Sequence, residues 1–313
     1  DDLSDASTVT RTFKPGETFN YKLTIKNNTD KAVEDGVVYD VLPKVKDVNT
    51  LDGSGRMTEY TVSLRGPVTA PEGWTVYYTT DTGVTTDTMA QAADKDIWTT
   101  AVADYSQVTG IKLVANAGTT IPARGEASFG VPVVNPSELT DEVKALMQER
   151  TKDNEDNGGR SGVVQAHNQF GYKAKGHEGN RESNTVTAQI FSAAFQVKKV
   201  DKDDPKKVLE GAEFTLTDAN GAVVATATSD KKGELSFNTL TEGTYTLKET
   251  KAPENYKLDE TEHAVVVTYD ADKQIYHVTV DGKAVGSKAV PVEIANEADI
   301  KYIDLEASKV WDD

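Results

Sequence analysis

The sequence predicts an all-β protein made of two tandem immunoglobulin-like β-sandwich domains. Short runs of alternating apolar and polar residues recur along the chain, separated by Gly, Pro, Asn and Asp, which is the pattern of half-buried strands joined by turns. The runs are rich in β-branched and aromatic residues, which favour strands. The length of 313 residues corresponds to about two domains of ordinary size.

The first domain is assigned to residues 1–192 and is expected to be the larger one. A turn-rich segment at residues 27–30 ends its first clear strand. Pro43 ends the second, because Pro cannot donate a main-chain hydrogen bond to a neighbouring strand. The strands predicted in this domain cover residues 19–25, 37–42, 74–78, 110–114, 127–134, 163–164 and 185–190.

Residues 137–148 break the strand pattern and predict a single short helix within the first sandwich. Ser137 stands where a helix cap is expected. Leu139, Val143 and Leu146 follow at the spacing of one helical face.

The polar stretch at residues 151–159 is predicted to be a loop. Its acidic spacing faintly resembles a calcium-binding loop, but the closing Glu of such a loop is absent, so we expect a solvated loop. The chain has no Cys, which excludes disulfides, thiolate zinc sites and thiol nucleophiles, and its four His residues are widely scattered. No metal and no cofactor is therefore expected.

The second domain is assigned to residues 193–299, because the strands become shorter and more regular near residue 193. Gly or Asp clusters, as at residues 218–221, separate these strands. Regular strands with turn signals at this spacing, over about 100 residues, describe an immunoglobulin-like sandwich. The predicted strands cover residues 195–200, 213–217, 223–228, 234–238, 243–249, 263–269, 274–280 and 290–296.

The charge of the chain excludes two classes of partner. Lys and Arg total 34 against 51 Asp and Glu, a formal net charge of −17. Such an acidic chain repels phosphate backbones and anionic lipids, so nucleic-acid binding and membrane-surface binding are disfavoured. No stretch approaches the roughly 20 apolar residues of a membrane span, and we expect no membrane insertion of this segment.

Three polar residues of the second domain stand at strand positions that alternation points inward: Lys199, Glu249 and Asn296. A buried, unpaired ammonium is costly, so an inward Lys needs a partner or loses its proton. Burial favours the uncharged forms of an amine and of a carboxyl beside it, and a neutral amine is a nucleophile. Held against the carboxamide of Asn296, the amine of Lys199 could expel ammonia and form an amide, with Glu249 moving the protons.

Local sequence identifies these three residues more specifically than periodicity does. Residues 199–201 (KVD), 209–216 (LEGAEFTL) and 243–256 (GTYTLKETKAPENY) occur in this order. They resemble collagen-adhesin B-type (CnaB) domains, which build the stalks and pili of Gram-positive surface proteins. The resemblance covers residues 195–299.

In that family a first-strand Lys bonds to a last-strand Asn or Asp, and a Glu in the "KET-APxxY" segment promotes the reaction. The resemblance therefore implies an isopeptide bond between Lys199 and Asn296, promoted by Glu249. Lys198 is the rival nucleophile, although alternation points it outward. The alternative is a buried hydrogen-bonded network without a covalent bond. In either case we expect a structural device without a substrate.

Residues 300–313 are assigned to a linker and the start of a following domain. Residues 309–313 (KVWDD) resemble the first strand of another domain of the same family. The chain is then a segment of a serial array, as expected of a stalk.

The first domain resembles repeat domains of large bacterial surface proteins that are related to the collagen-adhesin A-type sandwich. Residues 21–27 (YKLTIKN), 38–43 (VYDVLP) and 183–186 (SNTV) carry this resemblance. By that resemblance Asp40 matches the assisting role and Asn184 the accepting role of a second isopeptide bond.

The Lys of this second bond is missing at its expected place, around residues 8–10. Lys14, Lys22 and Lys26 are the substitutes, but Lys22 and Lys26 alternate onto the face opposite the apolar residues of their strand. The alternative is that Asp40 and Asn184 cap or hydrogen-bond the buried backbone.

The leading functional hypothesis is a structural and adhesive segment of a cell-wall-anchored adhesin or an accessory pilin, exported to the bacterial surface. A bond between first and last strands resembles a disulfide that closes a long loop, survives reduction and needs no Cys. Sortase and peptidoglycan are then partners through a region outside these residues. Neither a sorting motif nor a pilin linkage motif is visible, so a pilus shaft is less favoured.

Two other classes of function are alternatives. In the first, the first domain binds a host matrix protein or glycan through an insertion at residues 139–179 that carries His167, Phe170 and Tyr172; a solvated loop is the simpler interpretation of that insertion. In the second, the chain is an enzyme, but nothing resembles a nucleophile elbow, a P-loop or a zincin helix. We therefore predict no enzyme beyond a single-turnover self-crosslinking reaction.

Overall fold

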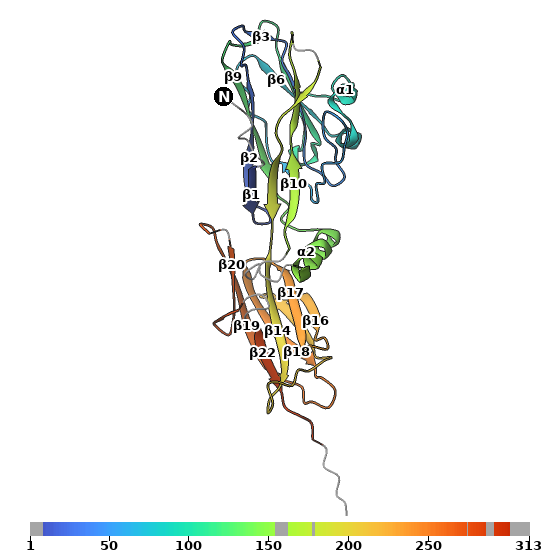
Figure 1. Cartoon of the computed structure of the whole chain (residues 1–313), viewed down its shortest axis with the longest axis vertical. Coiled ribbons are helices and arrows are strands. Elements are labelled where there is room, and N and C mark those ends of the chain that lie inside the picture. The colour runs from blue at the N-terminus through green and yellow to red at the C-terminus, as the bar shows by residue number, and fades with distance from the viewer. Residues whose placement is uncertain (1–8, 154–161, 177–178, 274, 286–290, 301–313) are drawn as a thin grey trace, which may run out of the picture. The chain divides into compact units, whose positions relative to one another are not determined.

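The computed structural model describes residues 9–153, 162–176, 179–273, 275–285 and 291–300 (Figure 1). The chain divides into two compact units, the first ending at Phe191 and the second continuing from Ser192. Each unit is built of β-sheets, which confirms the predicted all-β class. Within the described residues, no helix is long and apolar enough to cross a membrane.

The first unit contains four small sheets: β1-β13-β10, β12-β11-β4-β7-β6, β2-β9-β5 and β3-β8. Alternation explains their burial: Tyr21 and Leu23 of β2 point into the core, whereas Lys22 between them is exposed. The strands are β1 (Val9–Phe13), β2 (Thr18–Lys26), β3 (Val33–Glu34), β4 (Val37–Val41), β5 (Ser63–Leu64), β6 (Trp74–Thr79), β7 (Gly110–Ala115), β8 (Thr120–Ile121), β9 (Glu126–Val134), β10 (Val164–Asn168), β11 (Phe170–Lys173), β12 (Arg181–Glu182) and β13 (Val186–Ile190).

The predicted helix is present as α2 (Asp141–Asp153), but it begins four residues later than expected. Its cap is Thr140 rather than Ser137: the Thr140 hydroxyl accepts from the amide of Val143 at 3.4 Å. Two acidic residues in the first turn suit the positive end of the helix dipole. Val143 is buried as predicted.

In the described part of the chain, three further helical turns were not predicted, and they correct the expectation of a single helix. They are η2 (Thr82–Thr86), α1 (Met89–Ala92) and η3 (Tyr105–Gln107). Each is only three to five residues long, too short to produce a helical period in the sequence.

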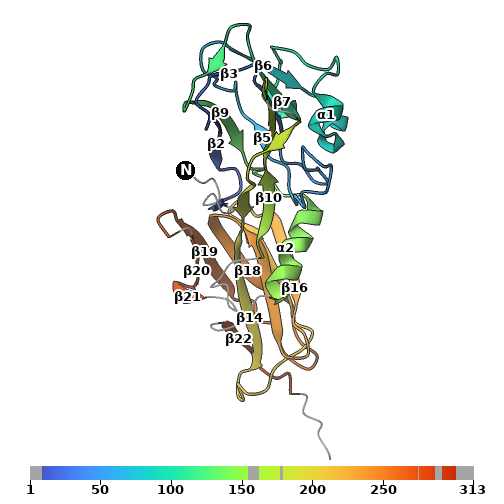
Figure 2. The same cartoon turned by 45° about the horizontal axis from the view of Figure 1, so that its top comes forward.

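The second unit is a sandwich of a three-stranded sheet, β17-β14-β22, and a six-stranded sheet, β16-β15-β18-β19-β20-β21 (Figure 2). In the smaller sheet β14 is central, antiparallel to β17 and parallel to β22. The strands are β14 (Ala193–Asp201), β15 (Glu213–Asp218), β16 (Val223–Thr228), β17 (Glu234–Leu240), β18 (Gly243–Lys251), β19 (Glu262–Asp270), β20 (Ile275–Val280), β21 (Lys283–Val285) and β22 (Val292–Asn296).

Candidate functional site

The site lies in the second unit and begins with Lys199 on β14. β14 is the central strand of the smaller sheet, and the Lys199 side chain on it has 0% of its surface exposed. In the pairing of β14 with β22, Lys199 is opposite Ile294 and Asp201 is opposite Asn296. Side chains two positions apart on a strand share a face, so Lys199 and Asn296 point to the same side of the sheet.

Glu249 and Phe214 come from the facing sheet, where they pair across β18 and β15. Lys199 Nζ lies 3.1 Å from Glu249 Oε1 and 5.1 Å from the centre of the Phe214 ring. Glu249 is 2% exposed and Phe214 is buried beside it. The ammonium therefore has a carboxyl as its ionic partner and an aromatic ring as its apolar wall.

Asn296 completes the site from the end of β22, where it is 1% exposed. Its Nδ2 donates to Glu249 Oε2 at 2.7 Å and to the carbonyl of Lys257 at 2.6 Å. Glu249 Oε2 also accepts from the main-chain amide of Asp259 at 2.7 Å. One carboxyl thus contacts the Lys199 amine with Oε1 and the Asn296 amide nitrogen with Oε2.

Burial controls the electrostatics of this group. Desolvation lowers the pKa of Lys199, and the nearby Glu249 charge opposes that shift only in part. Within the described residues, Lys199 Nζ, Glu249 Oε1 and Asn296 Oδ1 lack a hydrogen bond of good geometry. Unsatisfied buried polar atoms are uncommon in structural networks. The arrangement can place a neutral amine against a carboxamide with a proton carrier between them.

Lys198, the rival nucleophile, points to the other side of the sheet. It is half-buried and pairs across the strands with Glu234 and Glu293. All three residues predicted for this site are thus brought together, and Lys198 is not among them.

In the first unit the expected pair is not brought together. Asp40 is 0% exposed, whereas Asn184 lies on the exposed surface just before β13. Asn168 of β10 takes the expected place of Asn184: its Nδ2 donates to Asp40 Oδ2 at 3.4 Å. This corrects the prediction for Asn184, which is exposed in the irregular segment between β12 and β13.

The cation beside Asp40 is Arg56 and not a lysine. Arg56 donates to Asn168 Oδ1 at 3.3 Å and to the carbonyl of Val41 at 2.8 Å, and it forms an ion pair with Asp47. Of the proposed substitutes, Lys22 and Lys26 are exposed. A guanidinium stays protonated and is no nucleophile, so Arg56 does not take the role of the missing lysine. Lys14, the remaining substitute, is half-buried directly after β1.

Burial raises the pKa of Asp40 to about 7, against the opposing effects of Arg56 and of the Asn168 hydrogen bond. Asn168 and Arg56 were not predicted from the sequence, each for a different reason. Val164, Ala166 and Asn168 alternate inward on β10, a signal that could have indicated Asn168. Arg56 lies in an irregular segment without any period.

The insertion at residues 139–179, interpreted as a solvated loop or, alternatively, a binding loop, is mostly regular structure in its described residues. It holds α2, β10 and β11, and both Phe170 and Tyr172 pack against the hydrophobic core. His167 Nδ1 lies 2.9 Å from the Thr187 hydroxyl on the neighbouring strand. These three side chains lie on strands of the sandwich, so the preferred interpretation as a solvated loop and the alternative of a ligand site on that loop are both corrected.

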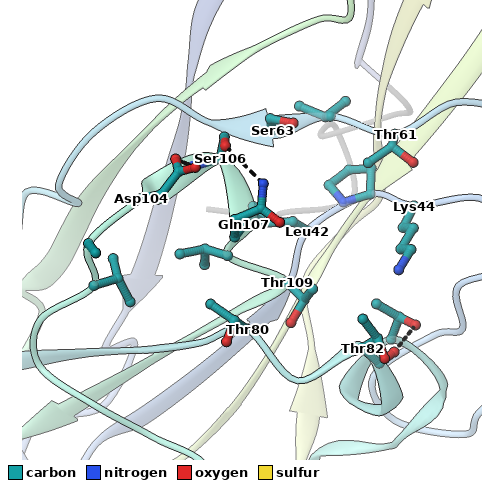
Figure 3. Close-up of a pocket in the computed structure, with 16 residues that line it drawn as sticks. Leu42, Lys44, Thr61, Ser63, Thr80, Thr82, Asp104, Ser106, Gln107 and Thr109 are labelled. Carbon is teal, nitrogen blue, oxygen red and sulfur yellow. Dashed lines mark hydrogen bonds between the residues drawn. The ribbon is translucent and has the colours of Figure 1, made fainter.

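A separate pocket of about 660 Å³ opens in the first unit (Figure 3). Seven of its sixteen lining residues are Ser or Thr, and Lys44 and Asp104 also line it. Gln107 donates to the Ser106 hydroxyl at 3.3 Å within it. Its floor is apolar and includes Leu42, Val62 and Val108.

No group of three or more His, Asp or Glu residues suited to a metal ion occurs in the part of the chain that the structure describes. The polar stretch at residues 151–159 lies outside the described residues from position 154 onward, and so does the expected following strand at residues 309–313.

Comparison with known proteins gives one family match: residues 193–284 match the SpaA prealbumin-like fold domain. A search of curated proteins finds no match. Among solved structures, the group B streptococcus pilus 2b backbone protein is 14% identical with a TM-score of 0.37, covering 92% of this chain and 95% of that one.

Two further solved structures are similar to the chain. BcpA, the major pilin subunit of Bacillus cereus, is 17% identical with a TM-score of 0.38, and the match covers 92% of this chain and 66% of that one. A 35 kDa C-terminal fragment of the major pilin GBS80 of Streptococcus agalactiae is 15% identical with a TM-score of 0.37, covering 92% and 96%. The family match confirms the sandwich fold predicted for the second unit.

Proposed function

We propose that this chain is a structural segment of a Gram-positive surface adhesin or accessory pilin, and that its second unit forms an autocatalytic amide bond between Lys199 and Asn296. The position of Glu249 carries the proposal, because its carboxyl touches the amine with one oxygen and the amide nitrogen with the other. The CnaB-like segments and the match of residues 193–284 to a prealbumin-like domain support it.

The reaction begins when the Lys199 ammonium gives a proton to Glu249 Oε1, which low solvent access favours. The lone pair of Nζ then attacks Cγ of Asn296, and the bond from Cγ to Nδ2 breaks as Glu249 supplies a proton to that nitrogen. Of the three protons on Nζ, one stays on the new amide and one completes the ammonia. The third remains on Glu249 until the ammonia removes it as ammonium. No oxidant or cofactor is needed.

The bond would stabilise the unit in two ways. It closes a loop of nearly 100 residues, and the chain-entropy account of crosslinks gives such a loop roughly 4 to 5 kcal/mol. It also joins β14 directly to β22, so force on the two ends of the unit passes through the crosslink and bypasses the other strands. The reaction turns over once and has no separate substrate.

The test is the intact mass of the denatured protein, wild type beside Lys199→Ala and Glu249→Ala. We expect the wild type to be lighter than its sequence by one ammonia, about 17 Da, and both variants to show the full sequence mass. Lys198→Ala is the matched control, since this neighbour points away from the site and should not prevent the loss. A wild-type mass equal to the sequence mass would leave a non-covalent buried cluster and contradict the proposal.

Location and partners follow from the same proposal. A segment of this kind is exported and attached to the cell wall by a sortase acting on another part of the protein. A crosslink without Cys suits that location, because it does not depend on redox conditions. Immunogold labelling of intact cells with an antibody to this chain tests the location, and labelling only after lysis would contradict it.

The pocket in the first unit favours a second candidate function, the binding of a host matrix protein or glycan. Its hydroxyl-rich lining offers donors and acceptors to a sugar or to a peptide backbone. Surface plasmon resonance with immobilised collagen, fibronectin and glycosaminoglycans tests this function. Binding that Lys44→Ala and Gln107→Ala both weaken would support it, and equal binding by these variants and the wild type would exclude this pocket.

A further inference from the structure

The segment at residues 253–259, between β18 and β19, contacts two of the three groups that exchange protons in the proposed reaction, Glu249 and Asn296. The carbonyl of Lys257 accepts from Asn296 Nδ2 at 2.6 Å. The amide of Asp259 donates to Glu249 Oε2 at 2.7 Å. Both are main-chain groups, so the position of the segment decides whether they can reach the side chains of Asn296 and Glu249.

These two bonds orient the carboxamide. The NH₂ group of Asn296 has two protons, and Lys257 and Glu249 accept one each. The nitrogen therefore faces the carboxyl, which is the side from which the leaving group must receive its proton. The amide of Asp259 holds Glu249 Oε2 toward Asn296 and leaves Oε1 for Lys199. Rotation of the carboxamide by half a turn would place its oxygen at the proton donor instead.

The segment is fastened to both strands that the bond would join. On the β22 side, Lys257 donates its amide to the carbonyl of Glu297 at 2.9 Å, and Asp299 donates to the carbonyl of Asn255 at 2.8 Å. On the β14 side, the hydroxyl of Tyr256 donates to Asp201 Oδ2 at 2.7 Å.

The carboxylate of Asp201 is itself held in place by main-chain hydrogen bonds. Its Oδ1 accepts from the amides of Asp203 and Asp204 at 2.8 and 3.1 Å. The Tyr256 hydroxyl first, and these amides next, lower the pKa of Asp201 to about 2. The carboxylate therefore remains charged and in one orientation throughout the neutral range, and a charged acceptor makes the stronger hydrogen bond.

We propose that Tyr256 and Asp201 are positioning residues for the crosslinking reaction, and this inference rests on the function proposed above. Their hydrogen bond holds the 253–259 segment over the site, so that Lys257 and Asp259 present the amide nitrogen of Asn296 to Glu249. Loss of the bond frees the segment on its β14 side. Small displacements from reactive geometry cost large factors in rate, so crosslinking should slow although all three reacting residues are intact.

The experiment measures the rate of crosslinking in newly made protein. The full chain is synthesised in a cell-free system, samples are quenched in acidic denaturant at intervals, and the fraction that has lost ammonia is read by intact mass. We expect Tyr256→Phe to crosslink at least about tenfold more slowly than the wild type. Asp201→Ala should slow crosslinking at least as much, because it removes the same bond and also the bonds from the amides of Asp203 and Asp204. The double variant should be no slower than Asp201→Ala alone.

Two controls separate positioning from general weakening of the fold. Tyr245→Phe also removes a hydroxyl hydrogen bond of the second unit, donated at 2.9 Å to the carbonyl of Thr241, and should crosslink at the wild-type rate. Asp201→Asn retains a polar partner for Tyr256 and should restore most of the rate that Asp201→Ala loses.

Three outcomes would overturn the inference. Crosslinking of Tyr256→Phe at the wild-type rate would show that the bond is dispensable. Equal slowing by Tyr245→Phe would indicate a general loss of stability. An unmodified wild-type mass would contradict the proposed function itself and this inference with it. That result is distinguishable from the other two, because it needs no variant.

Discussion

Lys199 and Asn296 lie on the same face of two adjacent parallel strands, β14 and β22, with their register positions two residues apart. Neighbouring parallel strands cannot be joined by a tight turn and need a long crossover, and here the crossover is the rest of the sandwich. The Lys199 amine and the Asn296 amide nitrogen both reach the carboxyl group of Glu249, at 3.1 and 2.7 Å, although they lie near the beginning and the end of the unit in sequence.

Glu249→Gln is expected to prevent the loss of ammonia while the protein still folds. Gln has nearly the same shape as Glu but cannot accept a proton from Lys199 at neutral pH, so the amine stays charged and unreactive. Intact mass after purification measures the result. Glu262→Gln, at an exposed ion pair with Lys248, is the matched control and should keep the loss. A crosslinked Glu249→Gln protein would show that this carboxyl is dispensable.

Single-molecule pulling should detect the bond mechanically. When the two ends of the chain are pulled, the crosslink of the wild type is expected to prevent the residues between Lys199 and Asn296 from extending. Lys199→Ala should release this extension, roughly 300 Å at about 3.5 Å per residue. Lys198→Ala should behave like the wild type. Full extension of the wild type would mean that no covalent shortcut exists.

Arg56→Met should destabilise the first unit strongly. Arg56 is buried between Asp47 and the Asp40–Asn168 pair, and removing one partner leaves buried carboxyl groups uncompensated at a cost of about 3 to 5 kcal/mol. Urea denaturation followed by the fluorescence of Trp74 and Trp98 reports on this unit. Arg124→Met is the matched control, since its ion pair with Asp30 is exposed and should matter little. Equal effects would argue against a special role of the buried cluster.

Asp40 should make the stability of the first unit depend on pH. Burial raises its pKa from 3.8 to about 7, so between these values the unfolded chain has lost a proton that the folded protein keeps. Its contribution to stability is therefore full below about pH 4, declines as the pH rises, and is lost above about pH 7.

The comparison of wild type with Asp40→Asn isolates this contribution, because Asn carries no titrating proton. The difference in unfolding free energy, wild type minus variant, should fall by up to roughly 4 kcal/mol between pH 4 and pH 7.5. Urea denaturation at several pH values measures it. A difference that stays constant over this range would show that Asp40 is already ionised in the folded protein.

Alternation identified most strands of both units, because a sheet with one buried face imposes a period of two. The prediction at residues 19–25 corresponds to β2 (Thr18–Lys26), and the prediction at residues 223–228 coincides with β16. Short elements such as β3 (Val33–Glu34) and β8 (Thr120–Ile121) were missed, since two residues cannot show a period.

Local sequence also indicated Lys199, Glu249 and Asn296, since polar residues at inward strand positions stand out against an apolar pattern. The same reasoning did not predict the buried cluster of the first unit correctly. Asn184 was assigned from a short motif and Asn168 was not among the candidates, yet the fold leaves Asn184 on the surface. A position next to a strand in the sequence does not establish whether the side chain faces the core or the solvent.

The sequence by itself determined the all-β class, most strands and three buried polar residues of the second unit, Lys199, Glu249 and Asn296, because each depends on periods and residue types within a few positions. Only the tertiary structure decided which distant groups meet: Arg56 beside Asp40, Asn168 in the expected place of Asn184, and Tyr256 on Asp201. Such contacts depend on how sheets stack and where irregular segments cross them, and no local pattern records that geometry.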